Sequence, residues 1–131
     1  MAQIPVGPTV LIVDDEQLIC ELIKEMLERM GYESTICTRA SDGLREFQRF
    51  KHGLVFADLS MPEIDGWDLS RSIKAISPET RVVLVTGLGH WVEPGKLVEC
   101  GVNQLLSKPF QFADVRLVVQ QALTPTPDVD A

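Results

Sequence analysis

Short apolar segments alternate with amphipathic segments along most of this 131-residue chain. Five segments rich in aliphatic and β-branched residues are predicted strands, at residues 10–13, 35–37, 54–57, 82–85 and 104–106. This alternation is typical of repeated βα units around a parallel sheet. The first, third and fourth segments are apolar throughout, as expected for strands covered by helices on both faces. The second and fifth are shorter or more mixed, so we expect them at the edges of the sheet.

The first and last predicted helices have the clearest apolar periodicity. In the first helix, these residues recur at helical spacing: Leu18, Ile19, Leu22, Ile23, Met26, Leu27 and Met30. Gly31 follows them as a helix stop signal. The inward stripe of the last helix consists of Phe112, Val115, Val119, Ala122 and Leu123. We expect both helices to pack on the sheet through these stripes, which leaves Leu117 and Val118 outside the core.

Two further helices are predicted between these two. The second helix covers about residues 41–50. The third turns Leu69, Ile73 and Ile76 inward and ends before Pro78, because proline disfavours α geometry in the residue that precedes it.

The fourth helix is less regular, because Pro94 and Gly95 fall within residues 89–100, where this helix should lie. Proline is tolerated in the first turn of a helix. We therefore expect a long loop and then a short helix that starts at about Pro94.

Length and composition fit one compact domain, which we place at residues 9–123. Residues 1–8 are expected to be a flexible N-terminal segment, and residues 124–131 a disordered tail or the stub of a linker. The formal net charge of −7 argues against direct nucleic-acid binding, because phosphate neutralisation needs clustered Lys and Arg. The chain has no apolar run of 18 residues and no secretory leader pattern, so we expect a soluble, cytoplasmic protein that does not bind membranes.

The three cysteines, Cys20, Cys37 and Cys100, are far apart and have no C-x-x-C spacing. This argues against a zinc site or a redox pair. We interpret them as small buried hydrophobic residues.

Charged and hydroxyl side chains follow the predicted strands. Asp14 and Asp15 come directly after the first strand, Asp58 after the third and Thr86 after the fourth, and Lys108 lies just past the fifth. In an open parallel sheet, ligands collect at the edge formed by the carboxyl ends of the strands. Each residue alone could have a local role, such as helix capping by Asp15. Three converging carboxylates repel one another, however, and a divalent cation would relieve that repulsion.

An all-oxygen ligand set without a neighbouring His or Cys indicates a hard ion such as Mg²⁺. A carboxylate beside such an ion can attack phosphorus and form an aspartyl phosphate. Lys108 would supply a positive charge, while the Thr86 hydroxyl and the Gly87 N–H group could donate to phosphoryl oxygens. The chain contains no Gly-rich phosphate loop, which disfavours a nucleotide-binding NTPase.

Four segments of the chain resemble the receiver domain family of two-component signalling. They are Val13-Asp14-Asp15-Glu16, Asp58-Leu59-Ser60-Met61-Pro62-Glu63-Ile64-Asp65-Gly66, Val85-Thr86-Gly87 and Ser107-Lys108-Pro109-Phe110. All four occur in the order that the family requires, each after its own predicted strand. The resemblance runs from about residue 9 to residue 123. It implies an α/β, flavodoxin-like (βα)5 doubly wound parallel sheet with strand order 2-1-3-4-5.

The resemblance also implies a phosphorelay switch that serves as a signalling protein. Asp58 would be the phosphoacceptor, with a histidine kinase or a phosphotransfer protein as the donor. Mg²⁺ would be bound by Asp15, Asp58 and the Ser60 carbonyl, and by Asp14 mostly through water. Such a domain catalyses only its own phosphorylation and dephosphorylation, so we do not class it as an enzyme.

On the phosphate side, the resemblance implies that Thr86 and Lys108 hold the phosphoryl group. The Lys108-Pro109 peptide bond is expected to be cis, which would turn the lysine inward. Leu105 stands where the family often has an aromatic residue that rotates inward during activation. The aromatic part of the usual switch is therefore missing from this chain.

The same motif predicts how the third helix begins. Asp65 looks like its N-cap, and Asp68 would be favourable in the first turn. Gly66 is expected to serve a tight turn after Pro62.

Two other functions are considered. A Mg²⁺-dependent phosphohydrolase can also use an aspartyl phosphate, but such enzymes usually need an acid two residues after the nucleophile, where this chain has Ser60. A non-phosphorylated docking scaffold would not need the intact set of site residues, Asp14, Asp15, Asp58, Thr86 and Lys108.

For the output surface, we consider a homodimer or partner patch on helices 4 and 5 that is sensitive to phosphorylation. Leu117, Val118 and Trp91 are its candidate residues. The alternative is that these are ordinary scattered apolar residues on the surface.

Overall fold

The computed structural model describes residues 8–87 and 91–124, and its centre is a single parallel sheet. The strands are β1 (Val10–Val13), β2 (Ser34–Cys37), β3 (Leu54–Asp58), β4 (Arg81–Thr86) and β5 (Gln104–Ser107). Their order is β2-β1-β3-β4-β5. The predicted strand order is therefore confirmed, and so are the edge positions of the second and fifth strands.

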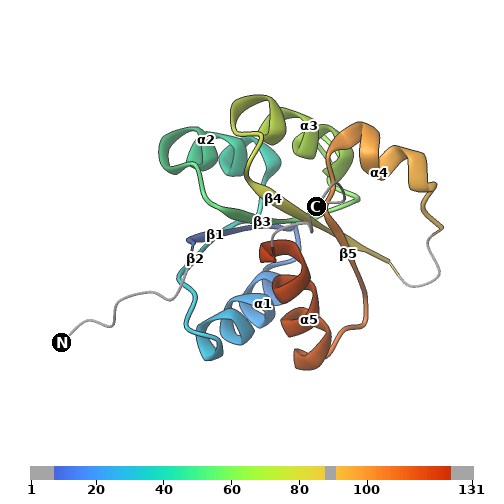
Figure 1. The fold of residues 1–131 in the computed structure, drawn as a ribbon. Helices are drawn as coiled ribbons and strands as arrows, with labels where there is room; N and C mark the ends of the chain where they lie inside the picture. The colour runs from blue at the N-terminus through green and yellow to red at the C-terminus, as the bar shows by residue number, and fades with distance from the viewer. Residues whose placement is uncertain (1–7, 88–90, 125–131) are drawn as a thin grey trace, which may run out of the picture.

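Within the described residues, five helices cover the sheet. They are α1 (Gln17–Arg29), α2 (Ala40–Phe50), α3 (Gly66–Ile76), α4 (Pro94–Cys100) and α5 (Phe112–Leu123). α1 and α5 lie together on one face, and α2, α3 and α4 lie on the other (Figure 1). The predicted start of the fourth helix at Pro94 is confirmed. Among the residues with described structure, no helix is long and apolar enough to span a membrane.

Some sequence predictions fall on residues without a described structure. The N-terminal segment 1–8 lies outside the described residues except for residue 8, and the tail 124–131 lies outside them except for residue 124. Residues 88–90, part of the long loop expected before α4, also lie outside.

Alternate residues of each central strand enter two separate core layers, because successive side chains of a strand point to opposite faces. In β1, Val10 and Ile12 face the layer under α1 and α5, while Leu11 and Val13 face the layer under α2 and α3. β3 follows the same alternation. Every residue of β1 and β3 is buried, as their apolar runs predicted.

Helix burial differs from the sequence prediction at three positions. Leu18 and Leu22 were expected to face inward, but their exposed fractions are 78% and 40%. Val118 was expected outside the core, but only 7% of it is exposed. The reason is how the helices neighbour each other. α1 and α5 each pack against two strands and against each other. In this arrangement α1 turns Cys20, Ile23 and Leu27 inward and leaves Leu18 outside, whereas α5 turns Val118 inward.

Several smaller predictions are confirmed. Cys20, Cys37 and Cys100 are free and buried. Gly31, just past the end of α1, has a φ of 89°, a left-handed conformation that favours glycine. The side chain of Asp65 caps α3 by accepting a hydrogen bond of 2.9 Å from the Asp68 N–H group.

Gly66 was expected to serve a tight turn after Pro62, but the structure shows a different reason for glycine at this position. Gly66 is the first residue of α3, and it is not among the glycines with positive φ. What it provides is space: a Cβ atom there would lie 2.6 Å from the Asp58 carbonyl oxygen. The close approach of α3 to the end of β3 therefore requires glycine at this position.

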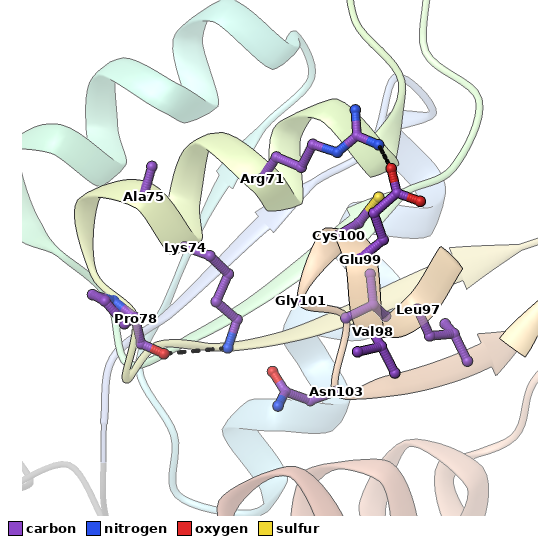
Figure 2. Close-up of a pocket in the computed structure, with 11 residues that line it drawn as sticks. Arg71, Lys74, Ala75, Pro78, Leu97, Val98, Glu99, Cys100, Gly101 and Asn103 are labelled. Carbon is purple, nitrogen blue, oxygen red and sulfur yellow. Dashed lines mark hydrogen bonds and ion pairs between the residues drawn. The ribbon is translucent and has the colours of Figure 1, made fainter. Parts of the chain in front are cut away.

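α4 is attached to α3 by polar contacts. The Ser70 hydroxyl donates to the Cys100 carbonyl at 2.7 Å, and Arg71 pairs with Glu99 at 2.7 Å. Figure 2 shows this pair at the rim of a cavity of about 550 Å³ between the two helices. None of the acidic residues that follow β1 and β3 lines this cavity.

Candidate functional site

The parallel strands end at one edge of the sheet and bring the predicted site residues there. Asp14 and Asp15 follow the end of β1, Asp58 is the last residue of β3, and Thr86 is the last residue of β4. Lys108 follows the end of β5, next to β4 in the sheet. Asp14, Asp58 and Thr86 are buried, whereas Asp15 is exposed. The edge thus combines two buried carboxyl groups with one that faces solvent.

Lys108 lies at the centre of the carboxylates. Its Nζ atom is 3.5 Å from Asp14 Oδ2, 3.7 Å from Asp58 Oδ1 and 3.7 Å from Glu16 Oε1. Asp14 Oδ1 accepts a 2.9 Å hydrogen bond from the Glu16 N–H group. Carboxylate oxygens of Asp14, Asp15 and Glu16 lie within 4.8 Å of one another. One ammonium group therefore faces three carboxyl groups, and a fourth, that of Asp15, lies beside two of them.

Burial and the excess of negative charge both raise the pKa values of the two buried carboxyl groups. Burial, together with the negative charge of Asp14, raises the pKa of Asp58 from 3.8 to about 6, although Lys108 acts in the opposite direction. Burial also raises the pKa of Asp14, against the Glu16 N–H group and Lys108. Partial burial lowers the pKa of Lys108, but the charges of Asp14, Asp58 and Glu16 outweigh it and raise the pKa overall. The buried carboxyl groups therefore need more positive charge than Lys108 supplies.

These residues fit a hard divalent cation. Asp14 Oδ2 is buried without a hydrogen-bond partner among the residues described, so it is free to coordinate a bound ion or to accept a hydrogen bond from the ion's water. The nearby donors are carboxylate oxygens, which Mg²⁺ prefers over nitrogen and sulfur ligands. A cation at this edge would relieve the repulsion that raises the pKa of Asp58.

An open pocket of about 630 Å³ lies beside the acidic cluster. Asp15 forms one side, and the loop after β3, which includes Ser60, forms another. Trp67 of α3 and Lys96 of α4 complete the lining, with Lys96 Nζ 5.2 Å from the centre of the Trp67 ring. The pocket is open to solvent and reaches the acidic cluster at Asp15.

On the other side, β4 and β5 bring the hydroxyl and ammonium groups together. Thr86 pairs with Ser107 in the sheet, and its carbonyl accepts a 2.8 Å hydrogen bond from the Lys108 N–H group. The Lys108-Pro109 peptide bond is cis. Gly87 is exposed, and Leu105 is partly buried against the core layer under α2 and α3.

Sequence reasoning assigned no role to two residues of the site. Glu16 lies within ion-pair distance of Lys108, and its signal was present, because it continues the acidic pair Asp14-Asp15. Lys96 had no such signal, since it comes from a short helix whose position over α3 is a tertiary feature.

Comparison with known proteins agrees with this fold. The family model "Response regulator receiver domain" matches residues 10–120. The chain therefore belongs to the response regulator receiver domain family.

Its relatives differ in length. The chain is 27% identical over 106 residues to the chemotaxis protein CheY of Thermotoga maritima, an alignment that covers 80% of this chain and 88% of that protein. It is 30% identical over 121 residues to the two-component response regulator ARR11 of Arabidopsis thaliana, which covers 91% of this chain but only 23% of the relative. The chain thus spans most of the chemotaxis protein and about a quarter of the larger regulator.

Solved structures give the same result. The response regulator receiver domain protein from Clostridium thermocellum superposes with a TM-score of 0.82 at 30% sequence identity. The match covers 89% of this chain and 94% of that chain.

Proposed function

We propose that this domain is a Mg²⁺-dependent phosphoacceptor of a two-component phosphorelay, with Asp58 as the phosphorylated residue and a histidine kinase or phosphotransfer protein as the donor. The observation that carries the proposal is the buried Asp58 carboxyl group, 3.7 Å from Lys108 Nζ at the open edge of the sheet. In this proposal the domain catalyses only its own phosphorylation and dephosphorylation.

Each residue would have a distinct role. Asp14, Asp15, Asp58 and the Ser60 carbonyl would hold Mg²⁺, which when bound neutralises charge on the carboxylates and the incoming phosphoryl group. The Asp58 oxygen would attack phosphorus as the bond to the donor's leaving group breaks.

Two elements would then hold the new phosphoryl group. Lys108 would pair with its oxygens, while the Thr86 hydroxyl and the Gly87 N–H group donate to them. Leu105 would repack when Thr86 moves, in place of an aromatic side chain.

The proposal is tested by labelling the protein with a small phosphodonor such as acetyl phosphate. We expect one phosphoryl group per chain in the presence of Mg²⁺ and none with EDTA, and peptide mapping should place the group on Asp58. Labelling at another residue, or labelling that is equal in EDTA, would contradict the proposal. Sustained turnover of a phosphate ester would instead favour a phosphohydrolase.

We further propose that the output surface is a homodimer interface formed by α4 and α5. Leu117 is 52% exposed and lines a hollow of about 340 Å³ with Leu105 of β5. This places an apolar contact beside the residue expected to move on activation. Trp91, 76% exposed before α4, would extend the surface.

Sedimentation with and without beryllofluoride, a phosphoryl mimic, tests this interface. With Mg²⁺ and beryllofluoride we expect the dimer fraction to rise at least tenfold, and Leu117→Glu should prevent the rise, because it places a charge in an apolar contact. Leu18→Glu, which changes an exposed residue of α1 outside the proposed interface, is the control and should still dimerise. An unchanged mass together with unchanged amide NMR shifts in α4 and α5 would count against the proposal.

A further inference from the structure

Helix α2 receives its N-terminal cap from another part of the chain. The residue at its own N-cap position, Arg39, makes no side-chain capping hydrogen bond. Instead, the carboxylate of Glu63, in the loop between β3 and α3, accepts a hydrogen bond of 3.3 Å from the Ser41 N–H group. The Ser41 hydroxyl donates to the same carboxylate at 3.1 Å, and Arg39 Nη2 lies 3.3 Å from it. A carboxylate at a helix N-terminus also interacts favourably with the helix dipole.

The acidity of Glu63 agrees with this contact. The hydrogen bond from the Ser41 N–H group, helped by the Ser41 hydroxyl and Arg39, lowers the pKa of Glu63. The group is thus held as the carboxylate that α2 requires. Exposed ion pairs contribute little on their own, so the two bonds from Ser41 are the important part of the contact.

The loop that carries Glu63 is the one that lines the acidic site. It begins at Leu59, whose N–H group donates to the Val85 carbonyl at 2.9 Å, and it ends where Gly66 N–H donates to the Leu59 carbonyl at 2.9 Å. Between these points, Met61 and Ile64 pack on the core. Within the described part of the chain, the Glu63 carboxylate makes the only hydrogen bonds that join residues 60–64 to another element.

We infer that Glu63 is a positioning residue for the metal site: by capping α2 it fixes the middle of the loop that presents the Ser60 carbonyl beside Asp15. Apolar packing of Met61 and Ile64 holds the loop against the core, but it is not directional. A loop that carries a metal ligand binds the metal only in its ordered conformation. The apparent affinity for the metal therefore decreases when fewer molecules are in that conformation. The inference rests on the proposed function, because it assumes that a divalent cation binds at this edge.

The first test measures Mg²⁺ affinity from Trp67 fluorescence. Trp67 is buried in the wall of the same pocket, and Trp91→Phe in all variants removes the exposed second tryptophan. Replacing Glu63 by glutamine should raise the Mg²⁺ dissociation constant about tenfold, at the low end of what loss of a group supporting a metal ligand costs. Ser41→Ala should also raise the Mg²⁺ dissociation constant. Because this change leaves the Glu63 charge in place, its effect cannot come from lost electrostatic attraction.

Asp42→Asn is the matched control. Asp42 lies in the first turn of α2 and pairs with Arg45, so its loss removes a charge from the same helix end without touching the loop. It should leave Mg²⁺ affinity within about twofold of the parent, because a substitution that shares no contacts with the metal site is not coupled to it. Thermal unfolding in EDTA checks that all variants are folded.

Labelling kinetics separate positioning from chemistry. In Glu63→Gln, saturating Mg²⁺ should restore the parent labelling rate, because the metal itself then orders the loop. The inference is overturned if Glu63→Gln binds Mg²⁺ like the parent, if Asp42→Asn weakens binding as much, or if the saturating rate falls. If the parent protein binds no Mg²⁺, the proposed function itself fails.

Discussion

Asp58→Asn is expected to abolish Mg²⁺-dependent labelling and, at the same time, to make the metal-free protein more stable. Labelling is lost because an amide oxygen is too weak a nucleophile to accept the phosphoryl group. Stability rises because Asp58 is buried beside Asp14, and its pKa is raised to about 6. Ionising it in the folded protein therefore costs free energy that asparagine does not. We expect a gain of about 1–2 kcal/mol in the free energy of unfolding at pH 7.

The pH dependence follows from the direction of this shift. The pKa of Asp58 is higher in the folded chain than its ordinary value of 3.8. The folded state therefore holds the proton more tightly, and the metal-free protein loses stability as pH rises from about 4 to about 6. The asparagine variant lacks this loss, so the two proteins should converge in stability near pH 4.

Urea unfolding in EDTA at pH 4 and pH 7 measures the effect. Glu79→Gln, which removes an exposed carboxylate distant in sequence from the cluster, is the charge-matched control and should change stability by less than about 0.5 kcal/mol. Added Mg²⁺ should stabilise the parent protein at pH 7 but not Asp58→Asn. If Asp58→Asn is less stable than the parent at pH 7, ionised Asp58 does not destabilise the metal-free fold.

Gly66→Ala is expected to destabilise the fold by about 3 kcal/mol, the upper end of the cost of overpacking. The added Cβ would lie 2.6 Å from the Asp58 carbonyl oxygen and 3.0 Å from Leu59 Cα. Both are backbone atoms, so no side-chain rotation can relieve the contact. Either α3 or the end of β3 must shift, and a shift of β3 would displace Asp58, the proposed phosphoacceptor. Mg²⁺ affinity should therefore fall with stability.

Gly95→Ala is the matched control for this substitution. Gly95 also lies in the first turn of a helix, but the nearest atom to an added Cβ is Glu93 Oε1 at 4.0 Å. Alanine is a better helix former than glycine, so we expect no loss of stability there. Thermal unfolding and Mg²⁺ titration of both variants provide the measurement. If Gly66→Ala is as stable as Gly95→Ala, the close approach of α3 to Asp58 is not required by the fold.

The strands, most of the helices and the composition of the acidic edge could be predicted from the sequence, because they follow from local patterns in the chain. Apolar runs marked the central strands, and a parallel sheet places all their carboxyl ends on one side. Asp14, Asp58, Thr86 and Lys108 each stand at the end of a predicted strand. Their meeting at one edge therefore needed only the strand order, which came from the resemblance to receiver domains.

Contacts between elements could not be predicted in this way. The burial of Val118 and the exposure of Leu18 depend on which helices are neighbours, and one helix's periodicity does not contain that information. The contact of Glu63 with Ser41 joins residues 22 positions apart, and no local pattern encodes it. Periodicity thus determined which segments form strands and helices and which residues reach the open edge of the sheet. Only the packed structure decided how the loop beside that edge is held, because that depends on distances between segments that the chain brings together only on folding.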